Sequence, residues 1–384
     1  MTAVYIVGGV RTPVGKTGGT LRNVLPEELG AMVLNELLAR FNLTPKDIDQ
    51  VIMGNAVGPG GNIARVCVLA AGWPYQIPAL TVDSQCGSGL SAINLAVDLI
   101  KAGAAELIIA GGVESTSLAP RRQFNPTDPR FKGADVFYER APFSTPAIGD
   151  PEPGIAAERL AEQLGIGRED MDRLALASHR RASHAQAQGV LADILVPVWN
   201  GRQLIDFDEC IRDDMSLRLL ARMKPAFLAG GKITAGNTCL THDGAAAVLL
   251  ASADAVRKYG WQPQGKVIAT AIAGCDPNIF PLGPVLAIRR LLSMAGCELT
   301  AIDALEINEA FAVKILACCR ELEYSLDRTN ILGGALAYGH PYGASGAIIL
   351  LHLLKALAQI NGQKGIAAIG AVGGQGVATL VERC

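Results

Sequence analysis

The sequence of 384 residues lacks any concentration of charge of one sign. Charged residues make up 18% of it, the formal net charge is -2, and no run of Lys and Arg exceeds two residues. Surfaces that bind nucleic acids or anionic membranes usually carry clustered basic residues. The sequence therefore predicts neither partner, and small molecules are the expected ligands.

The nine cysteines lack the spacings of a disulfide framework or a zinc site, and only Cys318 and Cys319 are neighbours. An odd number of scattered cysteines is typical of reduced thiols in a cytosol-like compartment, and we expect no bound metal. The first residues lack the basic and apolar regions of a signal peptide, and no apolar run has the length of a bilayer span. A cytoplasmic protein is predicted.

The sequence does contain an alternation of short β-branched runs with longer helical stretches rich in Ala and Leu. Such alternation predicts an α/β fold whose sheets are covered by helices. The pattern also repeats, because residues 37–56 resemble residues 291–310, and each segment precedes a Gly/Ser-rich helix start and a strand that ends in glycines. We infer two halves of like topology.

A segment of different composition separates the halves. Residues 119–242 begin rich in Pro and charge and continue with polar helices, and long insertions on rigid scaffolds usually carry binding functions. We interpret this segment as a lid/loop domain over a site that both halves build. The predicted division is 1–118 plus 243–264 for the N-terminal half, 119–242 for the lid and 265–384 for the C-terminal half.

The stretch DSQCGSGL places Cys86 between the end of a strand and the start of a helix. The helix dipole and free N–H groups favour a thiolate there, so we expect a lowered pKa and a nucleophile able to attack thioesters. A buried cysteine in a tight turn would give the same pattern.

Two further polar residues stand at the ends of apolar segments. His340, in GHP before the helix of the second repeat, could accept the thiol proton, although an imidazole bonded to nearby carbonyls is the alternative. Asn308, in LEINEAFA, ends a buried strand, where polar side chains are costly unless they are paired or functional. Asn308 could hold a water or a carbonyl oxygen, or it could cap the next helix.

Two glycine-rich segments do not support a nucleotide site. GKT at residues 15–17 lacks the glycine that a P-loop needs five residues earlier. The tail glycines of residues 370–376 lack the G-x-G-x-x-G spacing followed by a helix.

Together these segments resemble the thiolase family of acyl-CoA acetyltransferases over nearly the whole chain. GGVRTPVGKTGGTL, VIMGNAVGPGGNIAR, DSQCGSGL, AGGVESTSLAP, ITAGN, DGAAAVLL, NEAFA, GGALAYGHPYGASGA and VGGQGVATLVER are similar to that family's landmarks, in the same order. The resemblance implies a five-layer αβαβα core of two similar halves with an inserted lid/loop domain. It also implies an acetyl-CoA C-acetyltransferase or 3-oxoacyl-CoA thiolase, acting by thiolysis or Claisen condensation.

The resemblance assigns roles to the candidate residues. Cys86 is implied to carry the acyl group as a thioester, and His340 to activate it. His340 and a water held by Asn308 would bind the enolate oxygen, while the backbone N–H groups of Cys86 and Val372 would bind the oxygen of the tetrahedral intermediate. Coenzyme A (CoA) is the implied substrate, with no permanently bound cofactor, and the implied assembly is a homodimer or homotetramer. The residues implied to contact CoA are Arg212, near the nucleotide end, and Ala235, Gly236 and Phe311 along the pantetheine.

The sequence departs from the family in three places. Gly370 stands where the family carries a second cysteine, which moves a proton to and from the substrate α-carbon. Related sterol-carrier thiolases place a cysteine where this chain has Ala310, so that substitute is missing too. Cys239 replaces a serine beside the pantetheine, and it could be a displaced acid/base thiol or inert packing. Glu152 and Pro153 replace a usual His-Met pair, which adds negative charge near a polyanionic substrate.

Two functions follow from this pattern. A thiolase-type acyltransferase would pass the acyl group from Cys86 to CoA or to an acetyl-CoA enolate. A degenerate thiolase would bind CoA thioesters, or be acylated by them, without efficient carbon–carbon bond chemistry. Retention of Cys86, Asn308 and His340 favours catalysis, because a binding module needs no activated thiol. Restoring a cysteine at position 370 is then expected to raise acetoacetyl-CoA thiolysis.

Overall fold

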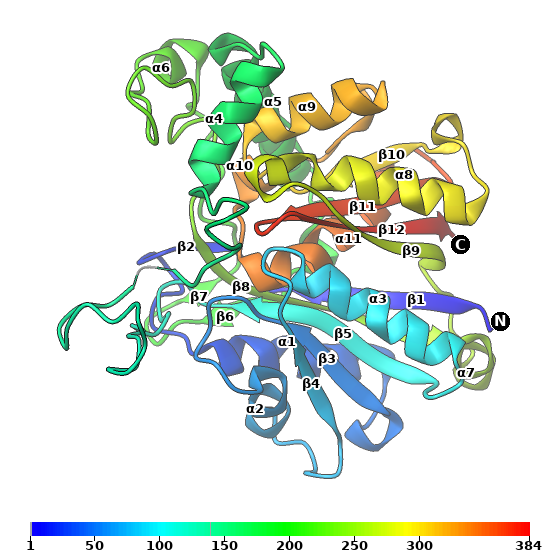
Figure 1. Cartoon of the computed structure of the whole chain (residues 1–384). Coiled ribbons are helices and arrows are strands. Elements are labelled where there is room, and N and C mark those ends of the chain that lie inside the picture. Colours follow the sequence, from blue (N-terminus) through cyan, green and yellow to red (C-terminus); the bar gives the residue numbers. More distant parts are fainter. Residues whose placement is uncertain (1, 139) are drawn as a thin grey trace.

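The computed structural model describes residues 2–138 and 140–384, and a mixed ten-stranded sheet runs through it (Figure 1). The order along the sheet is β10-β11-β12-β9-β1-β8-β5-β3-β4, with β2 paired to β8, while β6 and β7 form a separate ribbon. The strands are β1 (Val4–Arg11), β2 (Gly15–Lys16), β3 (Gln50–Gly54), β4 (Ala79–Val82), β5 (Leu107–Glu114), β6 (Val198–Trp199), β7 (Leu204–Ile205), β8 (His242–Ser252), β9 (Gly265–Gly274), β10 (Ala304–Ile307), β11 (Lys364–Ala371) and β12 (Gln375–Arg383).

The two halves of the sheet share one internal order. In the N-terminal half β3 pairs with β5 in parallel and β5 pairs with β8 antiparallel. In the C-terminal half β10 pairs with β11 in parallel and β11 pairs with β12 antiparallel. Strand β1 joins the halves, because it pairs antiparallel with both β8 and β9. The prediction of two halves of like topology is confirmed.

Helices cover the outer faces of the sheet and fill the space between its halves. Helices α3 and α11 lie between the halves, α1 and α2 cover the N-terminal half, and α8 and α9 cover the C-terminal half (Figure 1). Three apolar clusters fill the spaces between these layers, which gives the expected five-layer αβαβα order. The helices are α1 (Pro26–Phe41), α2 (Ile63–Ala70), α3 (Ser88–Lys101), α4 (Pro153–Gln163), α5 (Arg168–Ala187), α6 (Leu217–Ala221), α7 (Ala253–Tyr259), α8 (Gly283–Ala295), α9 (Ala312–Leu322), α10 (Ala335–Tyr338) and α11 (Tyr342–Gln359), with short 3-10 turns η1 (Pro45–Asp47), η2 (Ala192–Ile194), η3 (Pro277–Leu282), η4 (Leu299–Ala301) and η5 (Leu326–Arg328).

The two central helices approach closely at their N-terminal ends. A Cβ atom on Gly89 of α3 would lie 2.4 Å from the carbonyl oxygen of Gly343 in α11, a distance that only glycine permits. Cys86 lies two residues before α3, and His340 lies two residues before α11. The close approach therefore brings the residues that precede the two helices to one place.

The inserted segment packs mainly on the C-terminal half. Side chains of α4 and α5 share one apolar cluster with those of α8 and α9. Helix α5 also contacts α10, and α6 packs on α5 (Figure 1). The division of the chain at residues 119, 243 and 265 stays a prediction.

Helix α11 corrects one expectation from the sequence. It is long and apolar enough to cross a membrane, with a mean hydropathy of 1.2 over Tyr342–Gln359, whereas no such run was expected. However, 78% of that window is buried inside the fold. The helix is apolar all round because sheet surrounds it on both sides.

Candidate active site

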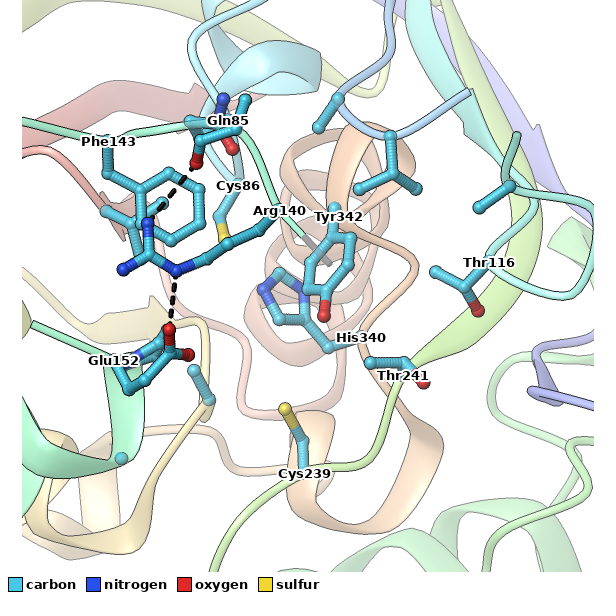
Figure 2. A pocket seen from close by; sticks show the side chains of 18 of the residues that line it. Gln85, Cys86, Thr116, Arg140, Phe143, Glu152, Cys239, Thr241, His340 and Tyr342 are labelled. Carbon is cyan, nitrogen blue, oxygen red and sulfur yellow. Dashed lines mark hydrogen bonds and ion pairs between the residues drawn. The ribbon is translucent and has the colours of Figure 1, made fainter. Parts of the chain in front are cut away.

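A cavity of about 540 Å³ opens where the residues preceding α3 and α11, the end of β10 and the β11–β12 turn meet. Its wall is largely apolar, with polar groups at a few positions, as is usual for small-molecule sites. Figure 2 shows Cys86 and Cys239 on opposite sides of the His340 ring in this cavity. The predicted site residues that line it are Cys86, Cys239, Phe311, His340, Gly370 and Val372.

Cys86 sits in a tight turn between β4 and α3. The Ser88 hydroxyl donates to the carbonyl oxygen of Gln85 at 2.5 Å and accepts from the N–H of Ser84 at 3.0 Å, and Gln85 adopts a φ of 56°. These bonds explain how the turn holds a strained residue beside the thiol.

The expectation of a lowered pKa for Cys86 is wrong for the unliganded site. Desolvation by burial raises the pKa of the thiol to about 11, and this outweighs the favourable effects of Lys314 and of the N–H groups of Cys86 and Val372. The sequence argument counted the helix terminus but not the loss of water around the sulfur. The thiol is therefore protonated at rest and needs a base to become a nucleophile.

His340 is buried and held from two sides. Its backbone N–H donates to Nδ1 of His242 at 2.9 Å, and its own Nδ1 lies 2.6 Å from the hydroxyl oxygen of Ser345. Desolvation, together with nearby Lys314 and His242, holds the pKa of His340 well below its usual value. The ring is therefore neutral, which is the state that can accept a proton.

Asn308 directly follows β10 and lies against the imidazole of His340. Its Nδ2 atom is 3.2 Å from Nε2 and 3.4 Å from Nδ1 of His340, while its buried Oδ1 has no hydrogen-bond partner among the described residues. Asn308 does not cap the next helix, because α9 has Phe311 at its N-cap position. A buried amide oxygen without a partner is costly unless it serves a ligand or a water.

Glu309, the residue after Asn308, is held in a network of hydrogen bonds that stabilises the fold. Its carboxylate accepts from the Ser178 hydroxyl at 2.6 Å, from Nδ2 of Asn330 at 2.8 Å and from the N–H of Leu336 at 3.2 Å. These bonds tie α5 and α10 to the end of β10 and leave the carboxylate fully engaged.

The glycine-rich tail forms the tight hairpin between β11 and β12. Ala371 pairs with Gln375, and Gly373 and Gly374 adopt φ values of 83° and 84° in the turn, a conformation that favours glycine. Gly370 lines the cavity, and a Cβ atom there would lie 2.8 Å from Cδ of Pro284. The position that the family resemblance assigns to the second cysteine is therefore at the cavity but tightly packed.

A second cavity of about 420 Å³ adjoins the first and shares its residues from Thr238 to Thr241. Ala235 and Cys239 line it, whereas Gly236 is buried, with its missing Cβ facing Leu220 and Met223. Arg212 is exposed, and its backbone N–H donates to Nδ1 of His179 at 3.2 Å. The structure thus brings Ala235 and Cys239, but neither Gly236 nor Arg212, to the cavity wall.

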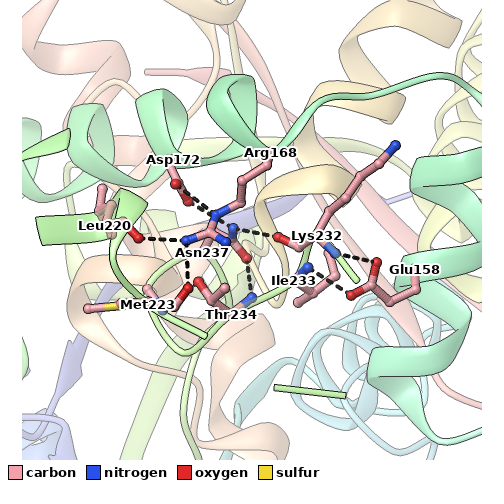
Figure 3. A network of polar contacts seen from close by, with 10 residues as sticks. Glu158, Arg168, Asp172, Leu220, Met223, Lys232, Ile233, Thr234 and Asn237 are labelled. Carbon is pink, nitrogen blue, oxygen red and sulfur yellow. Dashed lines mark hydrogen bonds and ion pairs between the residues drawn. The ribbon is translucent and has the colours of Figure 1, made fainter. Parts of the chain in front are cut away.

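The loop that carries Ala235 is anchored to α4 and α5 by a polar network (Figure 3). Glu158 accepts from the N–H groups of Lys232 and Ile233 at 2.9 and 2.8 Å. Asn237 donates to Asp172 at 2.9 Å, and Asp172 pairs with Arg168 at 2.7 Å. The network fixes the wall of the second cavity from behind.

The lid contributes a charged pair that sequence reasoning found only in part. Glu152 was expected to add negative charge, but its carboxylate bonds Nε of Arg140 at 2.7 Å (Figure 2), and Arg140 also bonds Asp150 at 2.9 Å. The Arg140 guanidinium lies 4.4 Å from the centre of the Phe143 ring. Because one guanidinium serves two carboxylates, the charge of Glu152 is only partly compensated. Arg140 is a wall residue for which the sequence analysis found no signal.

Sequence reasoning also missed Tyr342 and Lys314. Tyr342 lines the cavity, with its ring 5.1 Å from that of His340. Lys314 is completely buried next to the cavity wall, and its amine lies 3.4 Å from the carbonyl oxygen of Gly370. One signal was available, because Lys314 stands in an otherwise apolar stretch, AFAVKILACC.

Comparisons with known proteins cover the whole chain. The family model described as "Thiolase, N-terminal domain" matches residues 4–254, and the one described as "Thiolase, C-terminal domain" matches residues 261–383. The acetyl-CoA acetyltransferase of Chromobacterium violaceum is 41% identical over 389 residues, which cover 99% of each chain. Solved structures are also similar over 100% of this chain. The structure of the Bacillus anthracis acetyl-CoA acetyltransferase has a TM-score of 0.94 at 37% sequence identity, and 99% of that chain is covered. The structure of human mitochondrial 3-ketoacyl-CoA thiolase in complex with CoA has a TM-score of 0.92 at 34% sequence identity, and 98% of that chain is covered.

Proposed function

The chain belongs to the thiolase family and is a thiolase-type acyltransferase, and we propose that the thiol of Cys86 is its acyl carrier. One observation carries this proposal. The N–H groups of Cys86 and Val372 both favour the thiolate form of Cys86, in a cavity that also contains the neutral imidazole of His340. A thiol, a base and two N–H donors at one point are the parts that acyl transfer needs.

In the first half-reaction the Cys86 sulfur attacks the carbonyl carbon of an acyl-CoA or a 3-oxoacyl-CoA. His340 accepts the thiol proton, and the N–H groups of Cys86 and Val372 hold the oxyanion of the tetrahedral intermediate. The leaving group then departs, either as CoA thiol or as the enolate of acetyl-CoA, and takes up the proton. Oxyanion donors act where charge develops, and each contributes about 2.7 to 4 kcal/mol.

In the second half-reaction the acyl group passes from Cys86 to CoA or to an acetyl-CoA enolate. We assign the enolate oxygen to His340 and to a water held by Asn308. Support comes from the Asn308 amide, which lies against the His340 ring and whose buried oxygen has no partner within residues 2–138 and 140–384, so that it could hold such a water.

Coenzyme A is proposed to enter as a substrate through the second cavity, and no permanently bound cofactor is assigned. Ala235, Cys239 and Phe311 line the two joined cavities and suit the pantetheine arm. Gly236 would support this wall from behind, and the exposed Arg212 would meet the nucleotide end. Both of these last assignments rest on the sequence resemblance alone.

We also propose a homodimer or homotetramer in the cytoplasm. Strand β4 lies at one edge of the sheet, and Leu80 on it is 40% exposed, so a second copy could pair along this edge. The nine cysteines are free, which suits a reducing compartment. Light scattering of the purified chain tests the assembly, and a monomer would reject it.

Intact-mass analysis after incubation with acetyl-CoA tests the acyl carrier. We expect one acetyl adduct on the wild type, none on Cys86→Ala, and one on Cys297→Ala, which removes a thiol just beyond the C-cap of α8. An unmodified wild type would overturn the proposal and favour a chain that only binds CoA thioesters. An adduct without condensation or thiolysis would leave a half-reaction enzyme.

A further inference from the structure

Lys314 is a buried lysine at the back of the active-site wall. It lies on the first turn of α9 and is 0% exposed. Its amine makes one hydrogen bond, to the carbonyl oxygen of Gly370 at 3.4 Å, and no ion pair among residues 2–138 and 140–384 includes it. A buried ammonium with one neutral acceptor is costly, so the uncharged amine is favoured.

The groups that interact with Lys314 are the thiols and the imidazole of the site. Desolvation lowers the pKa of Lys314, while Cys318, Cys86, Cys239 and Cys275 oppose the shift. Lys314 in turn lowers the pKa of Cys86 and of His340. The amine is thus electrically coupled to the nucleophile and to its base.

The contact with Gly370 places the Lys314 amine behind one end of the cavity wall. Gly370 lines the cavity two residues before Val372, whose N–H lowers the pKa of the Cys86 thiol. Gly370 carries no side chain at the position where a second thiol would stand in the family. One peptide group therefore separates a titratable amine from the end of the cavity where the proton of the substrate α-carbon has to go.

We propose that Lys314 takes over the acid/base work of the missing second thiol, receiving the substrate α-proton through one water at the Gly370 end of the cavity. This rests on the proposed thiolase function. In the condensation direction the Cα–H bond of acetyl-CoA breaks, and its electron pair stays on the enolate. The proton passes to the water, a proton of the water passes to the neutral Lys314 amine, and the amine becomes an ammonium. In thiolysis the same path runs backwards and returns the proton to the carbon.

The acyl-enzyme removes the one way in which Cys86 could favour the charged form of the amine. A free Cys86 thiol can become a thiolate, which favours the charged ammonium. Once Cys86 is a thioester it carries no charge, so this support for the ammonium disappears. Cys86 therefore does not hold the amine in its charged form when a second acetyl-CoA must lose its α-proton.

Hydrogen exchange of the acetyl-CoA methyl group in D2O, followed by mass spectrometry, separates this step from acylation. We expect Lys314→Met to form the acetyl adduct on Cys86 but to lose exchange and condensation by about 10²- to 10⁴-fold, the usual worth of a general base. Lys314→Arg should fail likewise, because a guanidinium keeps the charge but cannot accept a proton. The control Lys355→Met removes a lysine on α11 that pairs with Asp193 of η2, and it should match the wild type.

The pH dependence of hydrogen exchange distinguishes an acid/base role of Lys314 from a purely structural one. Exchange by the wild type should rise with pH to a plateau as the amine loses its proton, and this rise should be absent in Lys314→Met. Full exchange in Lys314→Met, or loss in Cys239→Ala alone, would overturn the proposal and place the base elsewhere. Equal loss of adduct and exchange in Lys314→Met would overturn it as well. A wild type without an adduct would instead refute the thiolase function itself.

Discussion

Ser345 lies on the first turn of α11, and its hydroxyl oxygen is 2.6 Å from Nδ1 of His340. The backbone N–H of the same histidine bonds His242, so both ends of the residue are fixed. With Nδ1 bonded to Ser345, Nε2 is the nitrogen that takes part in chemistry, in place of its contact with Nδ2 of Asn308 at 3.2 Å. Hydrogen bonds to one ring nitrogen set the role of the other.

Ser345→Ala should therefore slow acylation without removing the thiol or the imidazole. The loss of one buried hydrogen bond costs about 1 to 3 kcal/mol, or about 5- to 150-fold in rate if it acts on the transition state. Rapid-quench measurement of adduct formation on Cys86 gives the rate. Ser252→Ala removes the cap of α7, far from the site, and should lower stability but not this rate. Equal rates for wild type and Ser345→Ala would show that the hydroxyl does not position the ring.

Acid should destabilise the fold partly through His242. Burial lowers the pKa of His242 to about 4, so below its unfolded value of 6.5 the unfolded chain binds more protons than the folded chain. Stability is therefore lost as the pH falls from 6.5 toward 4, by about 2 kcal/mol at pH 5 for this residue. His242→Asn keeps an acceptor for the N–H of His340 and should reduce the difference in urea stability between pH 7 and pH 5.

His184→Asn is the matched control for this difference, because His184 is exposed on α5. It should leave the pH dependence of stability as in the wild type. If His242→Asn also leaves it unchanged, His242 is protonated without cost in the folded chain, and its burial does not determine its charge.

Sequence analysis predicted the site residues that a local pattern marks, and it missed those that reach the site only through tertiary packing. Cys86, Asn308 and His340 stand at junctions of strands and helices, which glycine and apolar periodicity reveal, and the central helices bring two of these junctions together. The pKa of Cys86 was predicted in the wrong direction because desolvation depends on the surrounding fold. Lys314 was not predicted for the same reason, because only the packing of the β11–β12 hairpin brings Gly370 next to its amine.

Two ion pairs with the same spacing on α5 should differ in their effect on substrate binding. Asp172 pairs with Arg168 and bonds Asn237, and its side chain is 5% exposed. Asp172→Ala should cost about 2 to 3 kcal/mol of stability, below the 3 to 5 kcal/mol of a fully buried pair because Arg168 is 24% exposed. It should also raise the KM for CoA, because the loop bearing Ala235 loses its anchor (Figure 3).

Arg173→Ala breaks the second pair, between Arg173 and Glu169. The two side chains are 62% and 72% exposed, respectively. Exposed pairs of this kind contribute about 0.3 to 0.5 kcal/mol, so both stability and KM should stay near the wild type. Urea unfolding and steady-state thiolysis measure the two quantities. A KM for CoA that is the same in both variants would mean that the loop holds its shape without Asp172.

Pro284 should decide whether a cysteine can be restored at position 370. A Cβ atom there would lie 2.8 Å from Cδ of Pro284 and 3.1 Å from the carbonyl oxygen of Phe280, so Gly370→Cys forces a shift that costs about 1 to 3 kcal/mol. Gly370→Cys combined with Pro284→Ala should recover part of this stability, a non-additive effect expected of neighbours. Acetoacetyl-CoA thiolysis should rise more in the double variant than in Gly370→Cys alone, with Pro284→Ala alone as the reference. If Gly370→Cys is as stable as the wild type and already raises thiolysis, the strand has room for the thiol, and packing is not what separates this site from a two-cysteine one.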